Sequence, residues 1–187
     1  MPTIDASKIL IVSTHGFEQS ELEFPRDQLR AKGATVHVAT LDGNAIKGWE
    51  GDDWGREAEA DLKIADAKVE DYDALVLPGG QINPDLLRVD KDTMLLIRAF
   101  ADAGKIIAAV CHAPWLLVEA GIAKGREMTS YHSIRTDVEN AGANWVDQSV
   151  AISNGIITSR NPDDLKDFVS KIVEEVEEGK HPRDIAA

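Results

Sequence analysis

The stretch "KIIAAVCHAPWLLVEAG" (105–121) does most to indicate the fold. Its first part, 105–110, is a short apolar run with β-branched residues, which predicts a buried strand. Its second part, 113–121, predicts a helix that ends at a glycine. Cys111 and His112 fall between the two, at the carboxyl end of the strand. Because the sites of open α/β sheets lie at this edge, the stretch predicts both a fold class and the place of a site.

The same order of strand and helix recurs along the chain and predicts a mainly parallel sheet. Further strands are predicted at 8–13, 35–40 and 71–80, and further helices at 15–33, 89–104, 134–142 and 161–179. Residues 41–55, rich in Gly and Asp, predict a loop or a small hairpin. We expect one domain over residues 1–187, with its core at about 7–179, folded as a three-layer α/β/α sandwich. The tail, 180–187, is expected to fray.

Composition and charge argue against several classes of partner. The chain has 20 basic and 33 acidic residues, and its net charge of −13 repels nucleic-acid phosphates and anionic membrane surfaces. We expect no membrane span and no secretion signal, because no apolar run approaches about 20 residues and the first residues lack a basic region. A single cysteine cannot form an internal disulfide, which favours a reducing compartment. We therefore expect a cytoplasmic protein.

Cys111 is the first candidate catalytic residue. A side chain on a sharp turn between a strand and a helix stands exposed above the sheet, as in a nucleophile elbow. The positive end of the following helix would lower the pKa of a thiol there. The alternative is a small buried apolar residue, which is the usual fate of a lone cysteine. The local sequence supports both interpretations equally.

Three other features are predicted to lie near Cys111. His112 is either a general base or a histidine bonded to the backbone. Glu18 follows the first strand and could hydrogen-bond the thiol, although it could also be an ordinary acid at a helix start. Gly79 and Gly80 end the strand at 71–80, where their N–H groups suit an oxyanion pocket, but a tight turn would also require glycine.

The order and spacing of several motifs carry a family resemblance. They are "KILIVSTHGFEQSELEFPRDQLRAKGATVHVAT", "DYDALVLPGG", "AVCHAPWLL", "EMTSYHSIRTDVENAGANWVD" and "ITSRNPDDL". With them the chain resembles the PfpI family, the intracellular-protease and deglycase branch of the DJ-1/PfpI superfamily. The resemblance implies a flavodoxin-like fold shared with class I glutamine amidotransferases.

The resemblance also implies roles for individual residues. Cys111 resembles the family nucleophile, His112 its base, and Glu18 the acid that contacts the thiol. Gly80, with the backbone N–H of His112, resembles the oxyanion pocket. Asp85 stands where the family has the third member of a catalytic triad, contributed by a neighbouring subunit.

This implies a homo-oligomer, a dimer or a hexamer built from dimers, with the site at a subunit interface. Together with Gly79 and Gly80, the residues Ala113, Trp115 and His132 are expected to form the substrate pocket. Trp115 would make its wall bulkier or more apolar than the polar residue usual in the family.

Other chemistries find less support. A glutaminase of this fold would carry His-Pro-Glu late in the chain, where this sequence has "SRNPDDL", and His181 lies in the tail. The histidines at 15, 112 and 132 show no close ligand pair, and the glycines of "LPGGQINPD" match no nucleotide motif. We therefore expect neither a metal nor a cofactor.

Two functions follow from these residues. The first is a stress-response cysteine hydrolase that acts on glyoxal, methylglyoxal or their adducts on proteins, as a deglycase or glyoxalase-like enzyme, with intracellular peptidase activity as a further option. The alternative is a non-catalytic redox or stress sensor, or a holdase chaperone, that uses an oxidisable Cys111.

Overall fold

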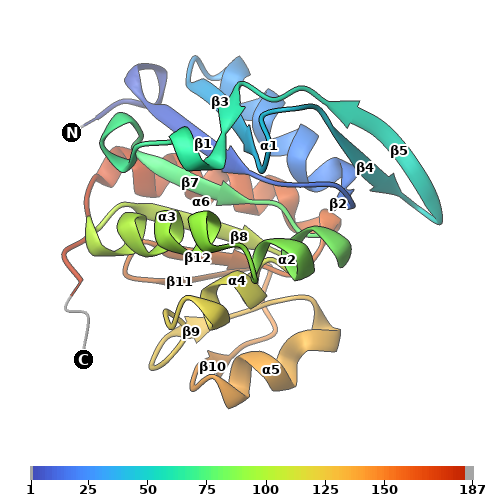
Figure 1. Ribbon diagram of the computed structural model, residues 1–187. Helices are drawn as coiled ribbons and strands as arrows, with labels where there is room; N and C mark the ends of the chain where they lie inside the picture. The colour runs from blue at the N-terminus through green and yellow to red at the C-terminus, as the bar shows by residue number, and fades with distance from the viewer. Residues whose placement is uncertain (1, 184–187) are drawn as a thin grey trace.

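A seven-stranded, mainly parallel sheet forms the centre of the computed structural model, which describes residues 2–183 (Figure 1). The strand order is β11-β12-β8-β7-β1-β3-β6, and the edge strand β11 is antiparallel to β12. The strands are β1 (Lys8–Val12), β3 (Thr35–Thr40), β6 (Leu62–Lys63), β7 (Ala74–Leu77), β8 (Ile106–Val110), β11 (Val150–Ser153) and β12 (Ile156–Ser159).

Helices cover both faces of the sheet, which confirms the predicted α/β fold with its parallel sheet. Side chains alternate along β1, so that Ile9 and Ile11 enter one core while Leu10 and Val12 enter the other. The first core packs under α1 (Gln19–Ala31) and α6 (Leu165–Glu178). The second packs under α2 (Ile82–Leu87), α3 (Lys91–Asp102), α4 (Pro114–Glu119) and α5 (Arg135–Asn140).

Two small sheets extend the body. The predicted loop or hairpin at 41–55 is an antiparallel hairpin, β4 (Ile46–Glu50) and β5 (Asp53–Ala58), which projects from the sandwich and pairs with β2 (Phe17–Glu18) (Figure 1). The other sheet joins β9 (Glu127–Met128) to β10 (Asn144–Trp145). Short 3-10 turns lie at Ile4–Ala6, Ile64–Asp66, Val69–Asp71, His132–Ile134 and Pro162–Asp164.

Two predicted boundaries need correction. The first helix begins at Gln19 rather than near residue 15, because β2 intervenes. Residues 180–183 do not fray: the backbone N–H of His181 donates to the Gly104 carbonyl at 2.9 Å. Residues 184–187 of the predicted frayed tail lie outside the described residues.

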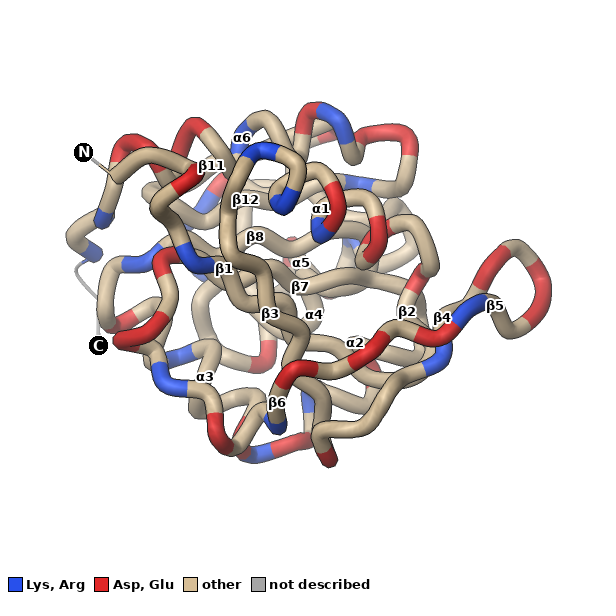
Figure 2. The backbone as a smooth tube through the Cα atoms, turned by 90° about the horizontal axis from the view of Figure 1, so that it is seen from above, with Lys and Arg blue, Asp and Glu red and all other residues tan. Residues whose placement is uncertain are grey.

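Acidic residues surround the molecule and reach the turn of the β4–β5 hairpin (Figure 2). Within residues 2–183, none of the helices combines the length and apolar character needed to cross a membrane. The carboxyl ends of β1, β7, β8 and β12 meet at one edge of the sheet, and the segments that follow them form the site described next.

Candidate active site

Cys111 occupies a strained turn directly after β8. Its φ is +64°, in the left-handed region, which costs a non-glycine residue about 1–2 kcal/mol. Two backbone hydrogen bonds hold this conformation: the Cys111 N–H donates to the Ser159 carbonyl at 3.0 Å, and its carbonyl accepts from the Tyr131 N–H at 2.8 Å. Cys111 is only 6% exposed, so the expectation that its side chain stands exposed above the sheet is wrong. The turn has the geometry of a nucleophile elbow, and neighbouring segments enforce it.

The turn brings the His112 ring back to the sulfur. Nδ1 of His112 lies 3.3 Å from Sγ of Cys111, and Nε2 lies 3.2 Å from Oγ of Ser133. The ring also stacks on Tyr131, with 4.9 Å between centroids, and meets the edge of Trp115. Burial lowers the pKa of His112, and the charge of His132 lowers it further. The imidazole is therefore neutral at pH 7 and can accept a proton.

Glu21, rather than Glu18, lies against the thiol, which corrects the sequence-based expectation. Glu18 ends β2, so α1 begins one residue later and Glu21 projects back from its first turn. The Glu21 side chain is fully buried, its Oε2 accepts from the Gly79 N–H at 2.8 Å, and its carboxyl is within hydrogen-bonding reach of Cys111. The sequence did contain a signal, since Glu21 precedes Pro25 by four residues on the buried stripe of α1.

Burial raises the pKa of Glu21 to about 8, and the charge of Glu18 adds to the rise. The carboxyl is therefore mostly protonated at pH 7. Its Oε1 is buried and has no hydrogen-bond partner among the residues that the structure describes. Since the carboxyl is within hydrogen-bonding reach of Cys111, its proton can be donated to the sulfur.

The thiol itself behaves differently from the expectation based on a helix terminus. Burial raises the pKa of Cys111, and so does an ionised Glu21, whereas hydrogen bonds from the backbone N–H groups of Gly80 and His112 lower it. The predicted lowering of the thiol pKa is wrong, because the effect of burial is larger than that of the positive end of the short helix α4. Protonation of Glu21 removes its opposing charge, so the carboxyl and the thiol act as a coupled pair.

Gly79 and Gly80 serve different purposes. Gly80 has φ +78°, and a Cβ on it would lie 2.6 Å from the backbone nitrogen of Glu18. A Cβ on Gly79 would lie 2.4 Å from Oε2 of Glu21 and 2.6 Å from the Val110 carbonyl oxygen. Since the Gly79 N–H already binds Glu21, the Gly80 N–H is the one of the two that faces the sulfur.

A fully buried asparagine, which the sequence analysis did not single out, ties this loop to the end of β1. Oδ1 of Asn83 accepts from the Thr14 N–H at 2.8 Å, and its Nδ2 donates to the Pro78 carbonyl at 2.9 Å. Ser133 was also missed, although it lies next to the predicted His132. Each of these positions depends on contacts with segments distant in sequence.

A cavity of about 750 Å³ opens over the thiol. It is lined by Gly16, Glu18, Glu21, Trp49, Gly51, Gly80, Gln81, Ile82, Cys111, His112, Tyr131, Ser133 and Pro162. The lining therefore contains two carboxyl groups and two large aromatic rings, with no lysine or arginine among its described residues.

Four predicted pocket residues lie behind this lining. Ala113 is buried in the turn, and Gly79 is buried behind Glu21. Trp115 packs against the edge of the His112 ring, and its Nε1 donates to Asp137 at 2.8 Å. His132 packs on Tyr131, with 4.3 Å between ring centroids. These residues pack around the side chains of the site from outside the cavity.

The fold and the motifs match known proteins. The model of the DJ-1/PfpI family matches residues 7–175. The chain belongs to the DJ-1/PfpI family. It is 36% identical over 166 residues to "Deglycase TK1284" of Thermococcus kodakarensis, covering 89% of this chain and 97% of that protein. It is 38% identical over 164 residues to "Putative cysteine protease YraA" of Bacillus subtilis, covering 87% and 94%. The crystal structure of Drosophila melanogaster DJ-1beta superposes with a TM-score of 0.82 at 31% identity, covering 92% and 94%.

In this DJ-1/PfpI chain, Asp85 does not reach the site around Cys111. It is exposed on α2 and is absent from the cavity lining. The ring nitrogen of His112 that faces away from the thiol instead contacts the hydroxyl of Ser133. Leu86 and Val89, on and just after the same helix, are 45% and 80% exposed. Asp85 thus lies on a partly apolar surface of the molecule.

Proposed function

We propose that this protein is a cysteine hydrolase of the PfpI type that acts on methylglyoxal, glyoxal or their adducts on proteins. The observation that carries the proposal is the strained Cys111, with the His112 imidazole 3.3 Å from its sulfur and Glu21 beside it. A name such as "Deglycase TK1284" for a relative that matches almost end to end supports the same class. Because the thiol has to stay reduced to act, we place the activity in the cytoplasm.

The contacts support a proton route for the first step. His112, whose pKa is lowered, takes the thiol proton at Nδ1, and Ser133 keeps the ring oriented through Nε2. The Glu21 hydroxyl and the Gly80 N–H then hydrogen-bond the thiolate as its charge develops. Because the pKa of the thiol is raised and that of His112 is lowered, the proton moves to His112 together with the attack of Sγ on the substrate, not before it.

The chemistry balances with water as the only co-reactant. Sγ of Cys111 displaces the amine of an aminocarbinol adduct: a carbon–sulfur bond forms, the carbon–nitrogen bond breaks, and the amine leaves with the proton held by His112. For a methylglyoxal adduct, proton transfer between the two oxidised carbons converts the resulting hemithioacetal into a lactoyl thioester. Water cleaves the thioester and releases lactate and the thiol. With free methylglyoxal, Sγ adds directly to the aldehyde.

The cavity supports adducts of basic side chains as substrates. Its lining combines Glu18 and Glu21 with Trp49 and Tyr131, which suits a cationic or neutral group between aromatic faces. An adduct on arginine keeps a planar, delocalised group that can stack there.

Lactate formation tests the activity. Purified protein is incubated with methylglyoxal alone and with preformed adducts of N-acetylarginine and N-acetylcysteine, and lactate is measured enzymatically. We expect formation that depends on Cys111, and Cys111→Ala should reduce it to background. Equal rates for the wild type and Cys111→Ala would overturn the proposal.

A redox sensor is the second candidate, because the Glu21 hydroxyl lies where it could hydrogen-bond an oxidised sulfur. Intact mass after mild peroxide discriminates the two functions. A clean addition of two oxygens to Cys111, in protein that forms no lactate, would favour the sensor or a holdase over the hydrolase.

The proposal includes a homo-oligomer in which Asp85 completes the site of a neighbouring subunit. The exposed Leu86 and Val89 beside it support a second copy as the covering partner. Cys111→Ala and Asp85→Ala, each inactive alone, are mixed, unfolded and refolded together. Random pairing as a dimer should restore about a quarter of the wild-type activity, because half of the dimers are mixed and each has one intact site. No recovery in a demonstrated mixed dimer would contradict the shared site.

A further inference from the structure

The C-terminal segment docks at the sheet edge opposite the thiol. After α6 the chain turns at Gly179, and His181 packs against the loop that precedes β8. Asn154, in the turn between β11 and β12, donates from Nδ2 to the Pro182 carbonyl at 3.0 Å. Because Cys111 follows the far end of β8, a five-residue strand of about 17 Å separates this place from the candidate active site.

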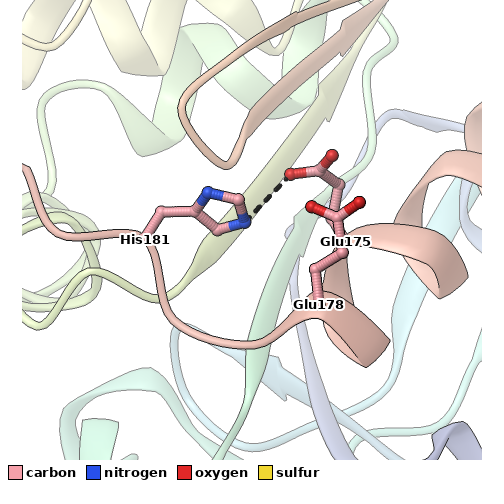
Figure 3. A group of neighbouring side chains, drawn as sticks. All are labelled: Glu175, Glu178 and His181. Carbon is pink, nitrogen blue, oxygen red and sulfur yellow. Dashed lines mark ion pairs between the residues drawn. The ribbon is translucent and has the colours of Figure 1, made fainter. Parts of the chain in front are cut away.

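Three ligand-type side chains converge there (Figure 3). Glu175 and Glu178 come from the last turn of α6, and His181 reaches back from the docked segment. One donor atom from each lies within 4.8 Å of the others. Nε2 of His181 lies 3.1 Å from Oε2 of Glu175, and Figure 3 shows the ring directed at that carboxylate.

The two closest donor atoms are buried and lie against each other, as an ion pair at 3.1 Å that lacks hydrogen-bond geometry. Glu175 is only 5% exposed, and neither its Oε2 nor Nε2 of His181 has a hydrogen-bond partner of acceptable geometry among the described residues. A buried polar atom without a hydrogen bond costs about 1–3 kcal/mol, so a ligand that binds both atoms would stabilise this part of the fold.

The nearby arginine does not supply the missing partner. Arg183 directs its guanidinium at three backbone carbonyls: Nε at Asn154 (2.8 Å), Nη1 at Ala101 (3.2 Å) and Nη2 at Lys105 (2.7 Å). These bonds fix the end of the segment and hold His181 beside α6. The carboxylates are therefore left facing the imidazole.

We propose that Glu175, Glu178 and His181 bind one divalent transition-metal ion of the Zn²⁺ class, with water completing its shell. Bonds of about 2.0–2.2 Å to one tetrahedral ion place two donors about 3.3–3.6 Å apart, slightly more than the 3.1 Å between Nε2 and Oε2. One imidazole and two carboxylates suit Zn²⁺ or Co²⁺ better than Ca²⁺, which prefers six to eight oxygen ligands. The ion would fasten the C-terminal segment to α6 and is remote from the hydrolase chemistry.

Metal titration of the whole chain tests the proposal. Metal-stripped protein is titrated with Zn²⁺ by calorimetry and with Co²⁺ by visible absorption, where a thiolate charge-transfer band would reveal binding at Cys111 instead. We expect one ion per chain without that band, and a higher melting temperature with Zn²⁺. His181→Ala and Glu175→Gln should each weaken binding at least about tenfold and abolish the stabilisation.

Glu174→Gln is the matched control, since Glu174 is an exposed carboxylate beside Glu175 on the same helix. It should bind Zn²⁺ as the wild type does. Should Glu175→Gln fail to fold, His181→Ala decides alone, with its circular dichroism spectrum as the check of folding. Unsaturable binding, a thiolate band at one equivalent, or undiminished affinity in His181→Ala would overturn the proposal, whatever the outcome of the lactate assay.

Discussion

Replacing Glu21 by glutamine should change how the stability of this protein depends on pH. The Glu21 carboxyl is fully buried, and burial together with the charge of Glu18 raises its pKa from 4.5 to about 8. As the pH rises, the unfolded chain therefore releases this proton first, near 4.5, while the folded protein keeps it until about 8. The free energy of unfolding of the wild type falls between these two values, and the contribution is unfavourable throughout the neutral range.

The magnitude follows from the two pKa values. At about 1.36 kcal/mol for each pKa unit, the rise from 4.5 to about 8 corresponds to about 5 kcal/mol at high pH. Roughly 3 to 4 kcal/mol of this loss develops between about pH 5 and pH 8. Glutamine has nearly the same shape and can still accept from the Gly79 N–H, but it cannot ionise. Relative to the wild type, Glu21→Gln should therefore gain stability steadily as the pH rises.

Urea unfolding of the reduced proteins at several pH values measures this difference directly. Taking the difference between variant and wild type cancels the groups that titrate in both. Glu23→Gln controls for the loss of a carboxyl from α1, because Glu23 forms its ion pair with Arg56 away from the thiol. A difference for Glu21→Gln that stays constant within about 1 kcal/mol between pH 5 and pH 8 would refute the reasoning and mean that Glu21 is already ionised in the neutral protein.

Three further predictions concern the supports of the thiol. Ser133→Ala should lower kcat/KM for lactate formation roughly 3- to 10-fold, because His112 loses the partner of its outer nitrogen, whereas Ser133→Thr should restore most of the rate. Gly79→Ala should lower the free energy of unfolding in urea by about 3 kcal/mol, because its Cβ has no space beside the Glu21 carboxyl and the backbone. An unchanged midpoint of unfolding would contradict this close approach. Asn83→Ala should lower the free energy of unfolding by at least about 2 kcal/mol, because the buried Thr14 N–H and the buried Pro78 carbonyl lose their partners. A variant as stable as the wild type, with a normal m-value, would disprove this anchoring role.

The sequence determined the sheet and the edge that carries the site. The apolar run before Cys111 and the glycines at 79–80 show where buried strands end, because strand periodicity and turn chemistry are local properties. Parallel strands with helical crossovers bring their carboxyl ends together, so the sequence alone predicts that Cys111 and the Pro-Gly-Gly loop lie at one edge. The same local pattern predicts a sharp turn at Cys111, whereas its left-handed conformation is held by hydrogen bonds with Ser159 and Tyr131.

Only the tertiary structure decided which side chains surround the sulfur. The sequence placed Glu18 against the thiol, but a short strand shifts the start of α1, and the first helical turn brings Glu21 there instead. The contact of Ser133 with His112 and the docking of His181 beside Glu175 join segments whose separation along the chain carries no information about distance. The direction of the thiol pKa was also decided by packing, because desolvation depends on everything that covers the sulfur and exceeds the local effect of a helix terminus.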